Sequence, residues 1–492
     1  MSETTAPREP SLWQSLLPLL FLVVALATSV YLFSDNSSYG GNQIALLLAA
    51  GVASIIGLRN GLKWDEIQTS MSHGIALAGG AILILLAVGS LIGTWMLSGT
   101  VPMMIDYGLR LMHPSYFYPA TCFVCALVAL TIGSSWTVAG TMGVSLMGVA
   151  QGLDLSPAIT AGAVISGAYF GDKMSPLSDT TNLAPAAAGS ELFAHIRHMV
   201  WTTGPSIVLA LVGFTIIGFT APATPAAAGG FDDLSAQLHA QFALGPHLLI
   251  PLVIVLVMAM KRMPAYPTIL IGALIGGVFA VLFQPDQVAR LAANADLSRP
   301  MAMLAGAWEA SINGFKLESG NTALDGLVSR GGMAGMLNPI WLTVCAMAFG
   351  AVMERAGLLE RLIRSVLAAA KSTGALIVAT LATAVGVNIT CADQYLAIVL
   401  PGRIYRPEYA RRGLDPVNLS RALEDAGTVT SPLVPWNTCG AFMAVTLGVH
   451  TLDYLPYALF NLINPIMAAA MAYFGFKILR LKPRAEVVHR DV

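Results

Sequence analysis

Long intervals without any charged residue set the strongest limit on how this chain can fold. No Asp, Glu, Lys or Arg occurs in residues 10–34, 263–285 or 372–392. Each interval holds a helix of about 20 residues, which is the length that crosses a bilayer. Backbone polar groups find no water in lipid, so a spanning segment of this kind must pair them within a helix. The sequence therefore predicts an all-α integral membrane protein.

The composition agrees with that prediction and excludes several functions. Hydrophobic residues make up 56% of the chain and charged residues 11%, against about 25% charged residues in soluble domains. The net charge of -1 argues against a nucleic-acid partner. The pair Gly331-Gly332 lacks the Lys-Ser/Thr of a phosphate loop, so transport is expected to be secondary and to need no cofactor. A membrane-embedded metal hydrolase has little support, because the eight histidines are dispersed.

The apolar runs predict about 11–13 membrane-spanning helices within a transporter domain over residues 11–480. Basic residues crowd the segments 261–262, 403–412 and 477–484, whereas residues 220–245 contain none. Short basic loops face the cytoplasm. We therefore expect an inner-membrane protein whose N-terminal tail (1–10) and C-terminal tail (481–492) are both cytoplasmic. The expected spans are 11–33, 42–58, 74–97, 115–133, 135–151, 199–219, 246–260, 266–283, 338–356, 373–392 and 454–476, with broken apolar regions at 157–190 and 426–450, and an amphipathic interfacial helix within 354–371.

An internal repeat is visible at a nearly constant offset. Ser175-Pro176-Leu177 recurs as Ser431-Pro432-Leu433, and Asn182 falls within one residue of Asn437. The polar patch Ser134-Ser135-Trp136 falls on Cys391-Ala392-Asp393. Many transporters consist of two inverted halves whose broken helices meet at the ion site. We therefore predict two inverted repeats, at about 74–220 and 330–476, with broken or re-entrant helices.

The first broken segment carries oxygen-rich side chains inside an apolar region. Asp172 and Asp179 flank Ser175, and Thr181 and Asn182 follow. Charges within a membrane are costly and usually functional. A carboxylate here binds either sodium or a proton, which is the simplest basis for exchange. Lys173 would then be a counter-charge, although Asp172-Lys173 is also compatible with a helix-end ion pair that faces water.

The second broken segment supplies further candidates. Its neutral ligand candidates are Asn437, Thr438 and Ser431. Asp393 is an acidic candidate in an otherwise apolar run, and Asn388 lies shortly before it and is a further neutral candidate. Glu424 and Asp425 just before this segment are either solvated acids at the mouth or part of a proton path. His195 and His198 are interpreted as a solvated helix end, with pH sensing as the alternative.

These motifs resemble a known family. Residues 167–184, GAYFGDKMSPLSDTTNLA, closely resemble the signature of NhaC-type sodium/proton antiporters, and residues 195–199, 391–395 and 431–438 are also similar to it. The resemblance covers about residues 10–480. It implies the ion-transporter superfamily, with inverted repeats, re-entrant hairpins, an elevator motion and a homodimer. It also implies that Thr181-Asn182 and Asn437-Thr438 are ion ligands at the hairpin tips.

The expected function is therefore sodium/proton antiport across a lipid membrane, with Na⁺ and H⁺ as the transported partners. Sodium is expected at Asp172, Asp179, Asn182, Asp393 and Asn437. The alternative is a sodium- and proton-coupled exchanger of small carboxylates, of the malate/lactate kind. That alternative requires a fixed cation for the organic anion, and Lys173 and Arg403 are the candidates.

Overall fold

The computed structural model describes residues 8–33, 37, 39–220, 230–292 and 296–481. These residues form helices without a β-strand, apart from one isolated bridge between Leu414 and Arg480. The predicted tails, 1–10 and 481–492, lie almost wholly outside the described residues. The α-helices are α1 (Leu12–Phe33), α2 (Gly41–Arg59), α3 (Trp64–Leu77), α4 (Gly79–Leu97), α5 (Thr100–Leu111), α6 (Pro114–Ile132), α7 (Ser135–Val138), α8 (Val144–Gly152), α9 (Pro157–Met174), α10 (Asp179–Ala188), α11 (Leu192–Thr220), α12 (Gly230–Gln241), α13 (Ile250–Met260), α14 (Ala265–Phe283), α15 (Pro285–Ala292), α16 (Arg299–Asn313), α17 (Thr322–Val328), α18 (Leu337–Arg355), α19 (Leu358–Ala369), α20 (Thr373–Thr390), α21 (Gln394–Arg411), α22 (Pro416–Leu423), α23 (Thr438–Leu447), α24 (Thr451–Tyr454) and α25 (Leu459–Tyr473).

Short 3₁₀ and π segments interrupt or extend several of these helices. The π-helical segments are η2 (Ala139–Gly143), which joins α7 to α8, and η6 (Glu424–Thr428), which continues α22. The 3₁₀ turns are η4 (Pro246–Leu249), η5 (Met333–Met336), η7 (Ser431–Leu433) and η8 (Leu455–Tyr457). π-helical turns are rare and are often found at functional sites, and η6 carries two of the predicted proton-path acids.

The all-α membrane prediction is confirmed, but the described helices yield fewer uninterrupted spans than expected. Eight of them are long and apolar enough to cross a bilayer, and up to ten if two bent pairs are each counted as one span. The expected single span 454–476 is one of these pairs, because its helices meet at an angle of 59°. The other pair joins α12 to η4 and α13 at 88°. The remaining difference from the predicted 11–13 spans arises where the helices are interrupted, at residues 135–152, 157–190 and 416–447.

The order of elements from α4 to α11 is matched by the order from α18 to α25. In both sets a long helix is followed by a left-handed glycine, Gly99 or Gly357, and a 12-residue helix, α5 or α19. In both sets the 10-residue helix after the broken segment, α10 or α23, ends at a left-handed glycine, Gly189 or Gly448. A matched order of this kind is what two repeats would produce.

The helix caps shift the alignment of the two repeats by two or three residues from the predicted one. Ser134 is the N-cap of α7 and Asp393 is the N-cap of α21, so Ser134 corresponds to Asp393 and not to Cys391. Likewise Ser178 caps α10 and Asn437 caps α23. Asn182, predicted to fall within one residue of Asn437, lies inside the first turn of α10, so the two asparagines occupy different positions in their helices.

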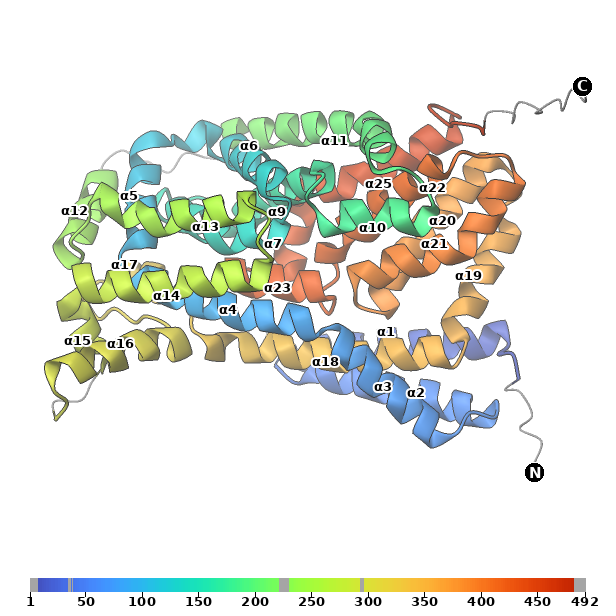
Figure 1. Ribbon diagram of the computed structural model, residues 1–492, viewed down its shortest axis with the longest axis horizontal. Helices are drawn as coiled ribbons and strands as arrows, with labels where there is room; N and C mark the ends of the chain where they lie inside the picture. Colours follow the sequence, from blue (N-terminus) through green and yellow to red (C-terminus); the bar gives the residue numbers. More distant parts are fainter. Residues whose placement is uncertain (1–7, 34–36, 38, 221–229, 293–295, 482–492) are drawn as a thin grey trace, which may run out of the picture.

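The helices pack around three groups of buried apolar residues. One joins α1, α2 and α18, a second joins α10 with α19–α22, and the largest joins α4–α9, α11, α14 and α23. Within the largest group, α6 lies against α9 (Figure 1). Gly167 and Gly171 of α9 make this approach possible, because a Cβ on either would collide with the backbone of α6.

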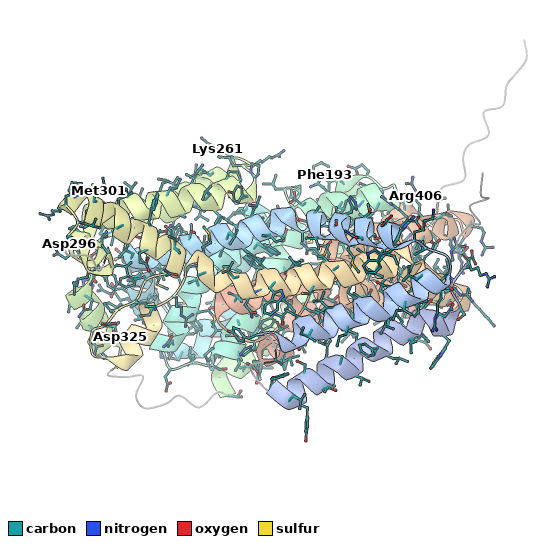
Figure 2. All side chains as sticks on the ribbon, turned by 90° about the horizontal axis from the view of Figure 1, so that it is seen from below. Phe193, Lys261, Asp296, Met301, Asp325 and Arg406 are labelled. Atoms are coloured by element: carbon teal, nitrogen blue, oxygen red, sulfur yellow. The ribbon has the colours of Figure 1, made fainter. Side chains whose placement is uncertain are left out.

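Both described ends of the chain lie at one end of the long axis, and α12 lies at the other (Figure 1). The helix α19 runs crosswise to α18 beside these ends (Figure 1), with Leu359 and Ile363 buried and Arg361 and Arg364 facing outward. Lys261 lies part-way along the molecule (Figure 2), and so does not join the other basic segments at the end with the termini.

Replacing Gly167 with alanine should destabilise the fold, because the added methyl group would overlap the carbonyl oxygen of Cys122. Overpacking of this kind typically costs about 1–3 kcal/mol. The melting temperature of the purified protein in detergent would measure the effect. Gly204→Ala is the matched control, because a Cβ at Gly204 meets nothing within 4 Å. Equal melting temperatures for the two variants would contradict the close α6–α9 packing.

Candidate ion-binding site

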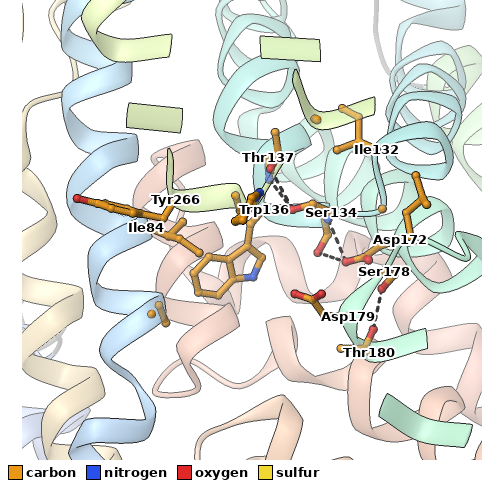
Figure 3. Close-up of a pocket in the computed structure, with 18 of the residues that line it drawn as sticks. Ile84, Ile132, Ser134, Trp136, Thr137, Asp172, Ser178, Asp179, Thr180 and Tyr266 are labelled. Atoms are coloured by element: carbon orange, nitrogen blue, oxygen red, sulfur yellow. Dashed lines mark hydrogen bonds between the residues drawn. The ribbon is translucent and has the colours of Figure 1, made fainter. Parts of the chain in front are cut away.

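A cavity of about 670 Å³ lies where the broken segments meet (Figure 3). Three acidic side chains line it: Asp172 at the end of α9, Asp179 at the start of α10, and Asp393 before α21. The other walls come from the junction of α3 and α4, the start of α7, the turn between α13 and α14, and the start of α23. Elements from both predicted repeats therefore contribute to one polar cavity.

Asp172 is held at the start of the helical segment that begins with α7. Its Oδ2 accepts hydrogen bonds from the backbone N of Ser135 at 3.0 Å and from Ser135 Oγ at 2.7 Å (Figure 3). The residue is only 8% exposed. The carboxylate thus satisfies a backbone N–H group at a helix start, which has no partner within its own helix. Both Ser135 bonds go to Oδ2, which leaves Oδ1 as the oxygen available to a cation.

Asp393 is the N-cap of α21, and its Oδ1 accepts a hydrogen bond from the N of Leu396 at 3.0 Å. The preceding residue, Ala392, is buried and has a φ of 56°, which is unusual for a residue with a side chain. The carbonyl of Ala392 accepts a hydrogen bond from the N of Thr438 at 2.9 Å. This contact ties the start of α21 to the start of α23, and both Asp393 and Thr438 line the cavity.

The tip between α9 and α10 is closed by the side chain of Asn182. Its Nδ2 donates to the carbonyl of Pro176 at 3.0 Å and to that of Ser178 at 2.7 Å. Pro176 has no backbone donor, and Ser178 caps the next helix, so α9 ends and α10 begins within four residues. The tip thereby presents Asp179 and Asn182 to the same cavity.

The other predicted ligands hold the tips in place and do not line the cavity. Thr181 Oγ1 donates to the carbonyl of Lys173 at 2.9 Å. Asn388 Nδ2 donates to the carbonyl of Gly427 at 2.6 Å, and Asn437 Nδ2 donates to Asn388 Oδ1 at 3.2 Å. Two further residues are engaged with backbone groups close to them in sequence, namely Ser175 and Ser431.

Lys173 lies in a separate buried group. Its Nζ is paired with Asp425 Oδ1, and both side chains are fully buried. Asp425 Oδ1 also accepts from Thr202 Oγ1 and Asn464 Nδ2, each at 3.0 Å. A water-facing Asp172–Lys173 pair is therefore the wrong interpretation, because the two residues are buried and bind different partners.

Glu424 and Asp425 are also fully buried, so the interpretation as solvated acids at the mouth is wrong. Both carboxylate oxygens of Glu424 lack a hydrogen-bond partner among the described residues. His195 and His198 are buried as well, which rules out a solvated helix end. The burial of the two histidines depends on α9, α22 and α25 packing against α11. The burial of the two acids depends on α20 and α21 packing against η6, and no local run of residues reveals such packing.

Several cavity residues were not predicted from the sequence. Ser135 was noticed only as part of a polar patch, and Trp136, Arg262, Tyr266, Gln394 and Tyr395 were not assigned to the site. Trp136 stacks on Phe442, with ring centroids 4.2 Å apart. The repeat offered a signal for Ser135, since its neighbour Ser134 corresponds to the N-cap Asp393. No sequence signal pointed to Arg262 as a cavity residue, because a basic residue between two spans indicates a loop.

The three acids share the cavity without converging on a single point. Among the described residues, no group of three His, Cys, Asp or Glu side chains is arranged to hold a metal ion. A sodium site would therefore draw on one or two of these carboxylates together with neutral oxygens. The predicted ligand set, with Asn437 included, stays a prediction.

A polytopic helical protein whose broken helices bring acidic side chains to one cavity belongs to the class of secondary transporters. A family model described as the Na⁺/H⁺ antiporter family matches residues 11–169 and 167–476. The chain therefore belongs to the Na⁺/H⁺ antiporter family.

Individual relatives agree with this assignment. The Na(+)/H(+) antiporter NhaC of Alkalihalophilus pseudofirmus is 40% identical over 89% of this chain and 91% of its own. The malate-2H(+)/Na(+)-lactate antiporter of Bacillus subtilis is 34% identical over 95% of this chain and 96% of its own. Among solved structures, the Alcanivorax borkumensis YdaH transporter covers 94% of this chain and 99% of its own at 13% identity, with a TM-score of 0.38, a likeness too distant to transfer any feature.

Replacing Asp425 with asparagine should destabilise the protein strongly, because it leaves Lys173 charged, buried and without its partner. Breaking a buried pair in this way costs about 3–5 kcal/mol. Thermal unfolding in detergent is the measurement, and the double variant Lys173→Met with Asp425→Asn should recover part of the loss. Glu360→Gln, which breaks an exposed pair with Arg364, is the control and should have no measurable effect. If Asp425→Asn is as stable as the wild-type protein, the Lys173–Asp425 pair is not formed.

Proposed function

We propose that this protein exchanges sodium for protons across the cell inner membrane, with Asp172, Asp179 and Asp393 as the acids of the sodium site. The observation that carries the proposal is their position in one cavity formed by elements of both predicted repeats. Asn182 and Thr438 line the same cavity and supply neutral oxygens. The exchange requires no cofactor and no enzymatic step.

Competition for the same carboxylates would couple the two ions. Asp172 accepts two hydrogen bonds from Ser135 on one oxygen, which leaves the other oxygen for sodium or a proton. Sodium would occupy the site when the carboxylates are ionised, and protonation would remove the charge that holds it. Glu424 and Asp425 would form the proton path, and Lys173 would be the counter-charge within it.

Alternating access would follow from two inverted repeats, at about 74–220 and 330–476, that move the tips between the two sides of the membrane. The matched order of helices supports the repeats. The described chain ends lie at the end of the long axis opposite α12 (Figure 1), which supports two cytoplasmic termini and an outward-facing α12. An elevator motion and a homodimer in lipid rest on the family resemblance alone.

The test is sodium-driven dissipation of a pH gradient in proteoliposomes, measured with a pH-sensitive dye. Asp172→Asn and Asp393→Asn should each lower the rate by roughly tenfold or more, equivalent to about 1.4 kcal/mol of barrier, because each removes a charge from the cavity. Asp154→Asn is the control, since Asp154 lies in the α8–α9 turn outside the cavity. Unchanged rates for both cavity variants would contradict the site assignment.

A second candidate function is the exchange of a small carboxylate together with sodium and protons. The cavity volume of about 670 Å³ lies in the range of pockets that hold small organic ligands, about 300–1,000 Å³. Arg262 lines it and supplies the fixed cation that an organic anion needs. Lys173 does not supply it, because it is paired with Asp425, and Arg403 is not part of the lining.

Counterflow of labelled malate or lactate into proteoliposomes would distinguish this second function. If a carboxylate is carried, Arg262→Gln should abolish its uptake and leave sodium-driven proton flux in place. Lys261→Gln is the matched control, because the neighbouring Lys261 is outside the lining. The absence of counterflow with every organic acid tried would eliminate the second function and leave the first intact.

A further inference from the structure

A second cavity, of about 540 Å³, lies between the starts of α11 and α22 and the segment after α25. It shares no lining residue with the first cavity. Its charged lining comprises Glu191, Arg197, His198, Asp415 and Lys477. The predicted ion site uses none of these residues, so this opening has no part in sodium binding as described above.

Acidic groups and a histidine occupy this second cavity. Glu191 accepts hydrogen bonds from the backbone N of Phe193 at 2.9 Å and of Ala194 at 2.7 Å. These bonds hold the pKa of the Glu191 carboxyl below its usual range, so it remains ionised at the entrance. His198 lies deeper, is 5% exposed, and has no hydrogen-bond partner at Nε2 among the described residues.

His198 lies at the edge of the buried group that contains Lys173. Arg421, Asp425 and Asp415 face it from α22 and η6, and His195 lies one turn before it on α11. Arg421 Nε lies 3.9 Å from Asp425 Oδ2, and Arg421 Nη1 is 3.4 Å from the carbonyl of Lys477. Arg421 therefore lies between Lys477, which lines the second cavity, and the Lys173–Asp425 pair.

Glu424 lies at the other end of this group. It is fully buried, and neither of its carboxylate oxygens completes a hydrogen bond among the described residues, although the hydroxyl groups of Thr180 and Thr428 lie beside it. Its electrostatic neighbours are Lys173, Thr180 and Asp172, and Thr180 and Asp172 both line the first cavity. Glu424 is thus the group through which the buried cluster meets the ion site.

The charges of the cluster allow Glu424 to release its proton as well as to hold it. Lys173 and Arg421 are positive and Asp425 is negative, so the cluster carries one excess positive charge while Glu424 is neutral. When Glu424 loses its proton, the two cations Lys173 and Arg421 are balanced by the two acids Asp425 and Glu424. An ionised Glu424 is therefore compensated by Lys173, and neither state leaves an acid without a counter-charge.

We propose that the cavity between α11 and α22 is a proton entrance separate from the sodium cavity, from which protons reach Glu424 by way of His198. This inference rests on the proposed sodium/proton exchange. Sodium would enter through the cavity lined by Asp172, Asp179 and Asp393. The two ions would then meet only where Glu424 and Thr180 adjoin that cavity.

Blocking the second cavity tests this separation. Ala194 lines the cavity, while the adjacent Phe193 is 58% exposed and does not. All five native cysteines are buried, so a bulky maleimide added before reconstitution would react at an introduced cysteine. Labelled Ala194→Cys should lose sodium-driven proton flux by roughly tenfold or more, equivalent to about 1.4 kcal/mol of barrier, and keep exchange of labelled sodium for sodium. Labelled Phe193→Cys should keep both.

The second measurement replaces the proposed entrance residue. His198→Gln should slow sodium-driven proton flux and leave sodium-for-sodium exchange, which also shows that the variant is folded. His247→Gln is the matched control, because His247 is also partly buried with an unpartnered Nε2 but lies outside both cavities.

The outcomes separate this inference from the proposed function. The separate entrance would be overturned if blocking left proton flux unchanged, or if it reduced sodium-for-sodium exchange as much as proton flux. In both cases the antiport of the wild-type protein would still support the proposed function. Absence of sodium-driven proton flux in the wild-type protein would instead overturn the proposed function.

Discussion

The structure depends on how a few ionisable groups are compensated inside an apolar protein. A charge within a membrane protein is stable only beside a partner or a water-filled cavity. Asp425 is compensated by Lys173, Asp172 by the Ser135 donors, and Asp393 by the start of α21. Each partner comes from an element distant in sequence or from a helix that begins at that point. The helix breaks and the buried charges therefore depend on each other.

The broken segments make the site possible because they expose helix ends in the middle of the protein. An uninterrupted helix has no free N–H groups away from its first turn. The caps Ser134, Ser178, Asp393 and Asn437 create four helix starts within one region. Those starts favour anionic groups, which are in turn the groups that bind a cation. The same construction occurs in both sets of elements, which is what two repeats would produce.

The geometry distributes the ionisable residues over two connected regions. One is an open cavity that is wide enough for a hydrated ion or a small solute, and the other is a buried cluster of ionisable groups around Lys173 and Asp425. In the open region a carboxylate exchanges partners readily, because water substitutes for any ligand that leaves. In the buried region each change of charge must be compensated by a neighbour, as Lys173 does for Asp425 and Glu424. Coupling between two ions follows naturally when such regions adjoin.

The sequence alone determined the membrane class, the broken segments and the family, because charge-free runs, proline positions and the 167–184 motif are local properties of the chain. It also singled out Asp172, Asp179 and Asp393, which line one cavity in the structure, since an acid in an apolar run is costly. Only the tertiary structure decided that Lys173 pairs with Asp425, that Asn388 and Asn437 bind each other, and that Arg262 lines the cavity. Those outcomes depend on helices far apart in sequence packing side by side, and burial of a side chain is a property of that packing.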